Sequence, residues 1–236
     1  MKHLIKDPMF ARLVSWLQQI QRFLAPRQKT VIRWFLVVEI GMVLFGALVS
    51  YVVIIDPIRF APLMSQAGGK LGQIAVLLFC LTLLPGIFNR LQWNTPLTAP
   101  VISLLTLFRR HVGILTFLTA AVHQLFNSII PNFIYFGSIL PTLPIPTFQL
   151  FGSLSWLILL PVWLTSNDTS QRLLGKKWKT LQRLTYIAIW FIFIHVSLQG
   201  KSLAIIIAIT AILEVASWVV AKRRKSIEMR KAGDIL

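Results

Sequence analysis

Long stretches of apolar residues alternate along this chain with short segments that carry charged residues and prolines. Six of these stretches approach the length of about 20 residues that an α-helix needs to cross the core of a bilayer, although the fourth and fifth are shorter. The pattern therefore predicts an all-α integral membrane protein, a bundle of six transmembrane helices. The predicted spans are Trp34–Ile55, Leu71–Phe88, Val112–Phe136, Leu150–Leu164, Leu184–Leu198 and Leu203–Val220.

The segment before the first span has apolar residues on one helical face and polar residues elsewhere. Its apolar positions are Phe10, Leu13, Val14, Leu17, Ile20 and Leu24, and its polar positions include Arg12, Gln18 and Arg22. This arrangement is typical of an amphipathic helix that lies in the membrane interface, and Pro26 is expected to end it. The chain is thus divided into an interfacial segment (1–30), a six-span domain (31–221) and a basic tail (222–236).

Composition agrees with a membrane protein: 56% of the residues are hydrophobic, 13% are charged, and the mean hydropathy is +0.73. A soluble domain carries about twice that charged fraction. The net charge of +17 does not indicate a nucleic-acid-binding surface, because the charges form short clusters between apolar spans. We expect contact with the lipid membrane and none with nucleic acid. Cys80, the one cysteine, excludes an internal disulfide and a four-cysteine iron–sulfur site.

The distribution of lysines and arginines predicts the orientation of the spans. Of the 24 basic residues, 21 lie in the N-terminal segment, the second loop, the fourth loop and the C-terminal tail. The opposite side has only Arg59, Lys70 and Lys201. Because short basic segments stay in the cytoplasm, both termini are predicted to be cytoplasmic, and the third and fifth spans both run outward.

Two histidines lie inside predicted spans at similar distances from a basic cluster. His123 follows Arg110 by thirteen residues, and His195 follows Arg183 by twelve. At a rise of about 1.5 Å per residue, both rings lie roughly 18–20 Å from the flanking charges, and so at one depth. Two neutral imidazoles at one level of a helix bundle suit the axial positions of a b-type heme. The neighbours expected to form a dry, aromatic pocket, or else a lipid-facing surface, are Phe117, Leu118, Ala121, Val122, Trp190, Phe191, Phe193 and Ile194.

Other ionisable residues in or near the spans have more than one interpretation. His111, beside Arg109 and Arg110, is expected to be an interfacial histidine, with a role as heme ligand or propionate partner as the alternative. Glu39 and Glu214 lie within apolar stretches. A carboxylate at such a depth either relays protons or accepts a hydrogen bond from a histidine N–H.

Sequence motifs of soluble enzymes are absent from the chain. It contains no HExxH, no GxSxG, no P-loop and no GxGxxG followed by an acidic residue. The glycine-rich run 68–72 (GGKLG) is too short for a nucleotide site and is expected to lie outside the membrane. The chain therefore has no dinucleotide or flavin domain of its own.

The run LTSNDTSQRLLGKKWKTLQRLTY, from Leu164 to Tyr186, is followed nine residues later by His195. This run resembles the ferric reductase-like transmembrane domain family, and within it the bacterial MsrQ (YedZ) group of heme-binding membrane subunits. The resemblance extends over about Leu71 to Leu198. The matching residues are Thr165, Ser166, Arg172, Leu174, Gly175, Trp178, Leu181, Tyr186 and His195, with Arg109, Arg110, Gly113 and His123 upstream and Gly152 and Trp156 in the fourth span.

The resemblance implies a six-span b-type cytochrome in the bacterial inner (plasma) membrane, with His123 and His195 as the axial ligands of a heme b. The family usually has a further fifth-span histidine at the position of Gln182, and its third-span counterpart falls near Arg109. One heme is therefore expected, with a second that uses His111 as the alternative. Electrons are expected to come from a cytoplasmic flavin reductase and to leave for an outer-face acceptor: a periplasmic methionine sulfoxide reductase, ferric iron or a quinone.

The basic fourth loop is the expected docking surface for the flavin reductase or its flavin phosphate. The loop contains Arg172, Lys176, Lys177, Lys179 and Arg183. An FMN or FAD supplied by that partner is expected to pack against Trp178. Arg110 and Arg172 are also expected to bind a cofactor. A competing interpretation is a non-heme small membrane transporter, in which Glu39, Glu214 and the histidines line a proton path.

Overall fold

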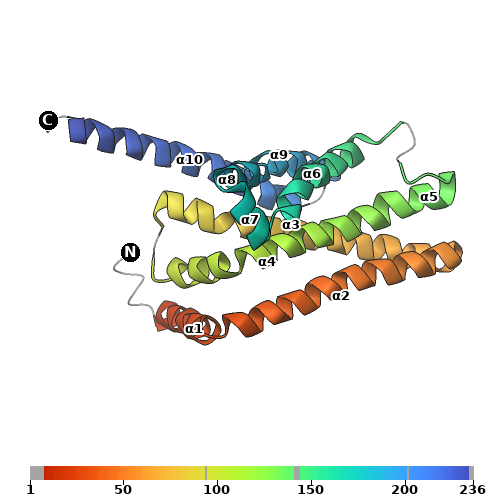
Figure 1. Cartoon of the computed structure of the whole chain (residues 1–236), viewed down its shortest axis with the longest axis horizontal. Helices are drawn as coiled ribbons and strands as arrows, with labels where there is room; N and C mark the ends of the chain where they lie inside the picture. Colours follow the sequence, from red (N-terminus) through yellow and green to blue (C-terminus); the bar gives the residue numbers. More distant parts are fainter. Residues whose placement is uncertain (1–7, 94, 141–143, 201, 234–236) are drawn as a thin grey trace.

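The computed structural model describes residues 8–233 except 94, 141–143 and 201. The first seven residues of the predicted interfacial segment and the last three of the basic tail lie outside this description. Within the described residues every regular element is a helix (Figure 1). Six helical segments there are long and apolar enough to cross a membrane, which confirms the predicted number of spans. They are Gln28–Ile55, Pro57–Leu91, Thr98–Phe136, Thr147–Leu164, Lys176–Leu198 and Leu203–Arg230.

Two of the spans consist of more than one element. The third continues from α4 through a π-helical turn, η2, into α5, and the fifth consists of α8 and α9. Pro131 follows the π-helical turn, which accommodates a proline that has no N–H to donate. The elements in chain order are α1 (Pro8–Leu24), α2 (Gln28–Ile55), α3 (Pro57–Leu91), α4 (Thr98–Gln124), η2 (Leu125–Ile129), α5 (Ile130–Phe136), α6 (Thr147–Leu164), α7 (Asp168–Leu174), α8 (Lys176–Gln182), α9 (Thr185–Leu198) and α10 (Leu203–Gly233).

Two helices extend well beyond the predicted spans. α3 begins at Pro57, where the Asp56 carboxylate accepts a hydrogen bond from the Arg59 N–H at 3.2 Å and proline occupies the first turn. The run 68–72 is therefore part of a continuous helix of 35 residues, which is one of the six candidate spans. Its expected position outside the membrane stays a prediction. α4 begins at Thr98, so the second half of the predicted loop between the second and third spans is helical.

α1 forms the predicted amphipathic helix, and Pro26 lies in the turn between α1 and α2. Figure 1 shows α1 nearly end-on while α2 runs along the bundle, so α1 is turned across the direction of the spans. It packs against α4 at the end of the bundle that also holds the C-terminal part of α10. A position in the membrane interface and a cytoplasmic location of the termini stay predictions.

α3 and α4 form the centre of the bundle, with α2 on one side and α6, α9 and α10 on the other (Figure 1). One apolar cluster, which includes Phe79, Leu83 and Ile189, joins α3 to the α6–α9 pair and to α10. A second, which includes Val53 and Phe126, joins α2, α3 and η2. The large apolar side chains of α2 mostly face outward, as expected for a helix in contact with lipid. α3 and α4 therefore form one wall of the space where the candidate site lies.

Candidate functional site

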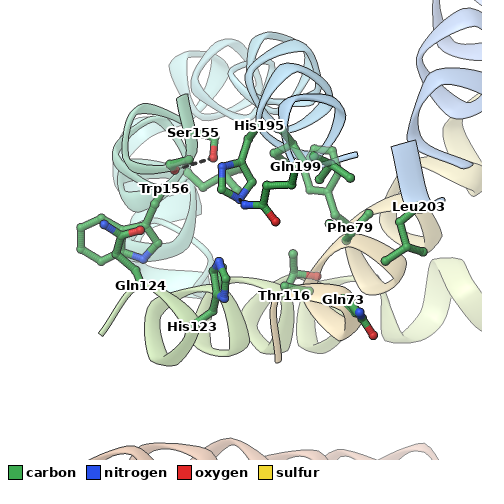
Figure 2. Close-up of a pocket in the computed structure, with 18 residues that line it drawn as sticks. Gln73, Phe79, Thr116, His123, Gln124, Ser155, Trp156, His195, Gln199 and Leu203 are labelled. Carbon is green, nitrogen blue, oxygen red and sulfur yellow. Dashed lines mark hydrogen bonds between the residues drawn. The ribbon is translucent and has the colours of Figure 1, made fainter. Parts of the chain in front are cut away.

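The histidines of the third and fifth spans lie next to each other. His123 on α4 and His195 on α9 have ring centroids 6.1 Å apart, and their ring planes make an angle of 75°. Figure 2 shows the two imidazoles pointing toward one another across a small cavity between α3 and α4 on one side and α6 and α9 on the other. We call this space, with a volume of about 70 Å³, the histidine cavity.

A backbone carbonyl holds each imidazole. Nδ1 of His123 lies 2.8 Å from the Gly68 carbonyl oxygen, and Nδ1 of His195 lies 2.6 Å from the Phe148 carbonyl oxygen. A carbonyl only accepts hydrogen bonds, so these two contacts require the proton on Nδ1 and leave Nε2 with its lone pair. The Asn127 amide nitrogen, 3.0 Å from Nδ1 of His123, then donates to the His123 backbone oxygen at 3.1 Å and not to the ring. The side-chain amide of Gln199, 3.0 Å from Nε2 of His195, donates to that lone pair. Both histidines therefore have the tautomer that a metal-ligating Nε2 requires.

The residues around the histidine cavity fit a heme. The two imidazoles, with ring centroids 6.1 Å apart, would hold its iron through their Nε2 atoms. The indole N–H of Trp156, which lines the cavity, is buried without a hydrogen-bond partner among the described residues, and it offers a donor to a bound polar group. The cavity is smaller than the roughly 300–1,000 Å³ of typical ligand pockets. The Gln199 amide, 3.0 Å from Nε2 of His195, would have to move aside before that nitrogen binds a metal.

None of the chain neighbours expected to form a pocket lines the histidine cavity, so the pocket interpretation of those residues is wrong and their alternative, a lipid-facing surface, stays a prediction. The residues that α4 and α9 contribute include Thr116, Ala120 and Ile192, three or seven positions before a histidine. Residues at that spacing share a helical face with the histidine, whereas adjacent residues point about 100° away. Phe117 instead packs in the apolar core, and Trp190 is 44% exposed.

A second cavity of about 480 Å³ lies beside the first and shares three lining residues with it. Trp156, Phe117 and Trp163 stack in a row, with centroid separations of 5.5 and 4.6 Å, and connect the walls of the two cavities. We call the second space the basic cavity, because cationic and aromatic side chains dominate its lining. They are Arg109, Arg110, Lys179 and Arg183, with Phe79, Phe117, Trp163, Trp178, Tyr186 and Trp218.

Of the five predicted cofactor-binding residues other than His123 and His195, three line the basic cavity and two do not. Gln182, Trp178 and Arg110 lie on its wall, whereas His111 and Arg172 do not. The Gln182 amide and the Trp178 indole both donate hydrogen bonds to the C-terminal end of α6. No histidine lines this cavity, and the described part of the chain contains no cluster of three or more His, Cys, Asp or Glu side chains that would hold a metal ion. Its chemistry suits a planar, anionic ligand.

His111 faces α2 and lines neither cavity. Its Nδ1 lies 2.9 Å from a carboxylate oxygen of Glu39, and the Phe35 ring stacks on the imidazole with a centroid separation of 5.4 Å. Glu39 is thus the partner of a histidine, but not of His123 or His195, whose Nδ1 atoms bond to carbonyls. The alternative role of His111 as a heme ligand or propionate partner finds no support in this arrangement.

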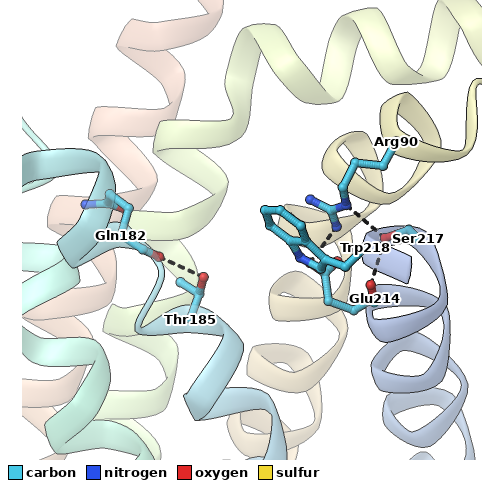
Figure 3. A network of polar contacts seen from close by, with 6 residues as sticks. All are labelled: Arg90, Gln182, Thr185, Glu214, Ser217 and Trp218. Atoms are coloured by element: carbon cyan, nitrogen blue, oxygen red, sulfur yellow. Dashed lines mark hydrogen bonds and ion pairs between the residues drawn. The ribbon is translucent and has the colours of Figure 1, made fainter. Parts of the chain in front are cut away.

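Glu214 also has a partner other than a histidine. Its carboxylate lies 2.5 Å from the Arg90 guanidinium and accepts a hydrogen bond from the Trp218 indole at 2.9 Å (Figure 3). Arg90 donates a second hydrogen bond to the Ser217 hydroxyl at 2.8 Å. Removing either charge would leave the other buried and uncompensated, which is costly inside a protein. Because Trp218 lines the basic cavity, this network supports one of its walls.

Arg110 connects the basic cavity to α7. Its guanidinium lies 2.7 Å from the Asp168 carboxylate. The hydrogen bond and the charge of Arg110 lower the pKa of Asp168 below the ordinary value of 3.8, with a smaller contribution from the charge of Arg172. Asn167 caps the same helix, since its side chain accepts a hydrogen bond from the Ser170 N–H at 2.8 Å.

Sequence reasoning missed the glycines that border the histidine cavity. Gly68 and Gly72 form a G-x-x-x-G pair on α3, a spacing typical of close helix–helix packing in membranes. A Cβ atom on Gly72 would lie 2.8 Å from the His123 ring, and one on Gly152 would lie 2.7 Å from the His195 ring. The G-x-x-x-G spacing of Gly68 and Gly72 is the signal in the sequence that indicates this close packing.

Comparison with known proteins identifies the class to which this fold and site belong. Residues 71–193, slightly more than half of the chain, match the ferric reductase like transmembrane component family, and the chain belongs to this family. The matched region contains His123 and ends two residues before His195. This match confirms the resemblance inferred from the run between Leu164 and Tyr186.

Individual curated proteins are also similar to this chain. The chain is similar to the protein-methionine-sulfoxide reductase heme-binding subunits MsrQ of Brucella ovis, Brucella canis and Brucella suis, with 33% identity over 95 residues in each case. The aligned region is 40% of this chain and 43% of each relative, so the match spans less than half the length of these curated relatives. No solved structure matches the chain.

Proposed function

We propose that this chain is the heme-binding membrane subunit of an electron-transfer system, a b-type cytochrome. The observation that carries the proposal is the pair of imidazoles of His123 and His195, 6.1 Å apart and both protonated on Nδ1. Membership of the ferric reductase-like family and the words "heme-binding subunit" in the names of the Brucella relatives support it.

His123 and His195 would hold one heme b through their Nε2 atoms, and the bound iron supplies one-electron chemistry. The carbonyls of Gly68 and Phe148 fix the direction of the two rings and increase the basicity of the ligating nitrogens. Apolar wall residues such as Phe79 exclude water, which influences the reduction potential. A second heme is not proposed, because no histidine lines the basic cavity.

The basic cavity is the proposed entry point for electrons. Its four cationic side chains attract an anionic partner or a flavin phosphate. The Trp178 indole, anchored to the Thr165 carbonyl at 2.9 Å, offers a fixed aromatic surface beside them. A cytoplasmic flavin reductase that supplies FMN or FAD fits this chemistry. Arg172 lies outside the cavity on α7 and would contribute to docking only through its charge.

Both termini are proposed to face the cytoplasm of a bacterial inner membrane, with electrons leaving on the opposite side. The basic residues support this orientation, since 21 of the 24 lie in the N-terminal segment, the second loop, the fourth loop and the C-terminal tail. Reporter fusions at the C-terminus and between α5 and α6 should give opposite signals, and equal signals would contradict the orientation.

The proposed acceptor is a methionine sulfoxide reductase, in line with the names of the relatives. Ferric iron and a quinone are the alternatives. Mixing the reduced protein with each acceptor and following heme oxidation distinguishes the three. The acceptor assignment fails if only ferric iron or only the quinone reoxidises the protein.

A visible spectrum of the purified protein tests the central proposal. We expect a Soret band, with α and β bands after reduction, and a heme content near one per chain. A colourless protein would favour the competing transporter. The structure gives that alternative little support, because Glu39 pairs with His111, Glu214 pairs with Arg90, and neither carboxylate lines either cavity.

A further inference from the structure

The same local arrangement occurs at both histidines, on two different pairs of helices. On α3, Gly68 provides the carbonyl that accepts from His123, and Gly72, four residues later, lies against the imidazole. On α6, Phe148 provides the carbonyl that accepts from His195, and Gly152, again four residues later, lies against the imidazole. Each ring thus contacts one helical turn that has an acceptor at its start and a glycine at its end.

The geometry of the α-helix explains why the fourth residue is a glycine. A helical carbonyl accepts the N–H of the residue four positions later, and a second lone pair remains for a donor that approaches from the side. A side chain on that later residue would stand in the path of such a donor. With Cβ atoms only 2.8 Å and 2.7 Å from the nearest ring atoms, residues larger than glycine at 72 and 152 would displace the imidazoles.

We propose that Gly72 and Gly152 are positioning residues for the axial ligands: their missing side chains allow His123 and His195 to reach the Gly68 and Phe148 carbonyls, and so set the direction of each Nε2. This inference rests on the proposed cytochrome function. Neither glycine has a positive φ, so the requirement comes from the contact with the ring and not from the backbone conformation.

The His123 side has an additional constraint. The Asn127 side-chain nitrogen lies 3.0 Å from Nδ1 of His123 and 3.1 Å from its backbone oxygen. A Cβ atom on Gly68 would lie 2.3 Å from that nitrogen, so this glycine also clears space beside the ring. Two glycines, Gly68 and Gly72, therefore leave space at or beside the His123 ring, whereas Gly152 alone leaves space at the His195 ring. We expect the His123 ring to tolerate substitution at its glycine less well than the His195 ring.

Alanine substitutions test the proposal against a purely structural role in helix packing. The test variants are Gly72→Ala and Gly152→Ala. Gly69→Ala, on the same helix as Gly72, and Gly41→Ala are matched controls, because a Cβ atom at either position meets nothing within 4 Å. Alanine favours a helix more than glycine does, so the controls should be neutral or slightly stabilising.

The readouts are heme affinity, the midpoint potential and the electron paramagnetic resonance spectrum of the ferric protein. Losing an outer hydrogen bond to a ligand weakens metal binding by about 10–100-fold, which is the loss expected for both test variants. A less basic imidazole stabilises ferric iron less, so the midpoint potential should rise. The low-spin signal should change as well, because it depends on the angle between the imidazole planes. Unchanged affinity, potential and low-spin signal in both test variants would overturn the proposal.

A double-mutant cycle keeps the proposal testable where a variant loses all heme. In the heme-free protein, Gly72→Ala should lower the melting temperature when His123 is present and should have no such effect in a His123→Ala background. Gly152→Ala and His195→Ala form the equivalent pair. An effect that is the same in both backgrounds would show that the glycine does not act through the ring. A wild-type protein without a Soret band would instead refute the cytochrome function, and the cycle would still report on the contact.

Discussion

The histidine cavity and the basic cavity share walls and differ in chemistry. The third and fifth spans present His123 and His195 to the first, and thirteen residues earlier in each span they present Arg110 and Gln182 to the second. Heme iron binds a ligand atom through a lone pair, which a neutral imidazole offers and a guanidinium lacks. The comparison shows that a few side chains on a common scaffold decide whether a level of the bundle suits a heme or an anion.

The largest expected effect is the loss of the heme ligands. His123→Ala or His195→Ala should reduce the heme-to-protein ratio by at least about tenfold, since one axial nitrogen disappears. A pyridine hemochrome assay on the purified protein measures the ratio. His111→Ala is the matched control, because this histidine faces Glu39 and lines neither cavity. If either ligand variant inserts into the membrane and keeps a normal heme content, the assignment of His123 and His195 as the heme ligands is wrong.

Making the basic cavity resemble the histidine cavity is the next test. Gln182→His places an imidazole on the wall of the basic cavity, and Gln182→His with Arg110→His places one on each of the two spans. We expect the heme-to-protein ratio to rise in the single variant and more strongly in the double variant. Lys177→His is the control, since Lys177 is exposed on α8 and does not line the cavity. A wild type that already binds two hemes would contradict the difference drawn between the cavities.

A smaller effect is expected at Gln199. Its amide donates to Nε2 of His195, the atom proposed to bind iron, so this hydrogen bond competes with the heme. A hydrogen bond contributes about 0.5–1.5 kcal/mol, so Gln199→Ala should increase heme affinity by about two- to tenfold. Heme titration followed at the Soret band measures the change. Gln73→Ala, at another position lining the same cavity, should have no such effect. Weaker heme binding in Gln199→Ala would show that the amide assists the heme.

The smallest effect concerns the ion pair outside the basic cavity. The pKa of Asp168 is lowered below 3.8 by Arg110, so its contribution to stability is present above that pH and is lost as the pH falls through the lower folded value. Because Asp168 is exposed, the contribution is small and weakened by salt. The melting temperatures of wild type and Asp168→Asn should differ slightly at neutral pH and converge in acid. A change in heme content would show that the two cavities are coupled.

Much of the fold follows from the sequence, because crossing a bilayer imposes a strong constraint on composition and helix length. The six spans and the amphipathic α1 are examples. The ends of α3 and α4 were not predictable from hydrophobicity, since helices continue beyond the apolar core wherever caps and tertiary contacts support them. The Asp56 cap and the burial of Ile102 near the start of α4 are such features.

By itself, the sequence determined how far along the third and fifth spans the two imidazoles lie, and that Gln182 stands thirteen residues before His195. Only the tertiary structure decided the tautomers of His123 and His195 and the residues that line the two cavities. The physical reason is that hydrophobic periodicity sets the position of a residue along a membrane helix but hardly sets the rotation of that helix about its axis. Close contacts between side chains and the backbone of neighbouring helices, such as those at Gly72 and Gly152, set the rotation.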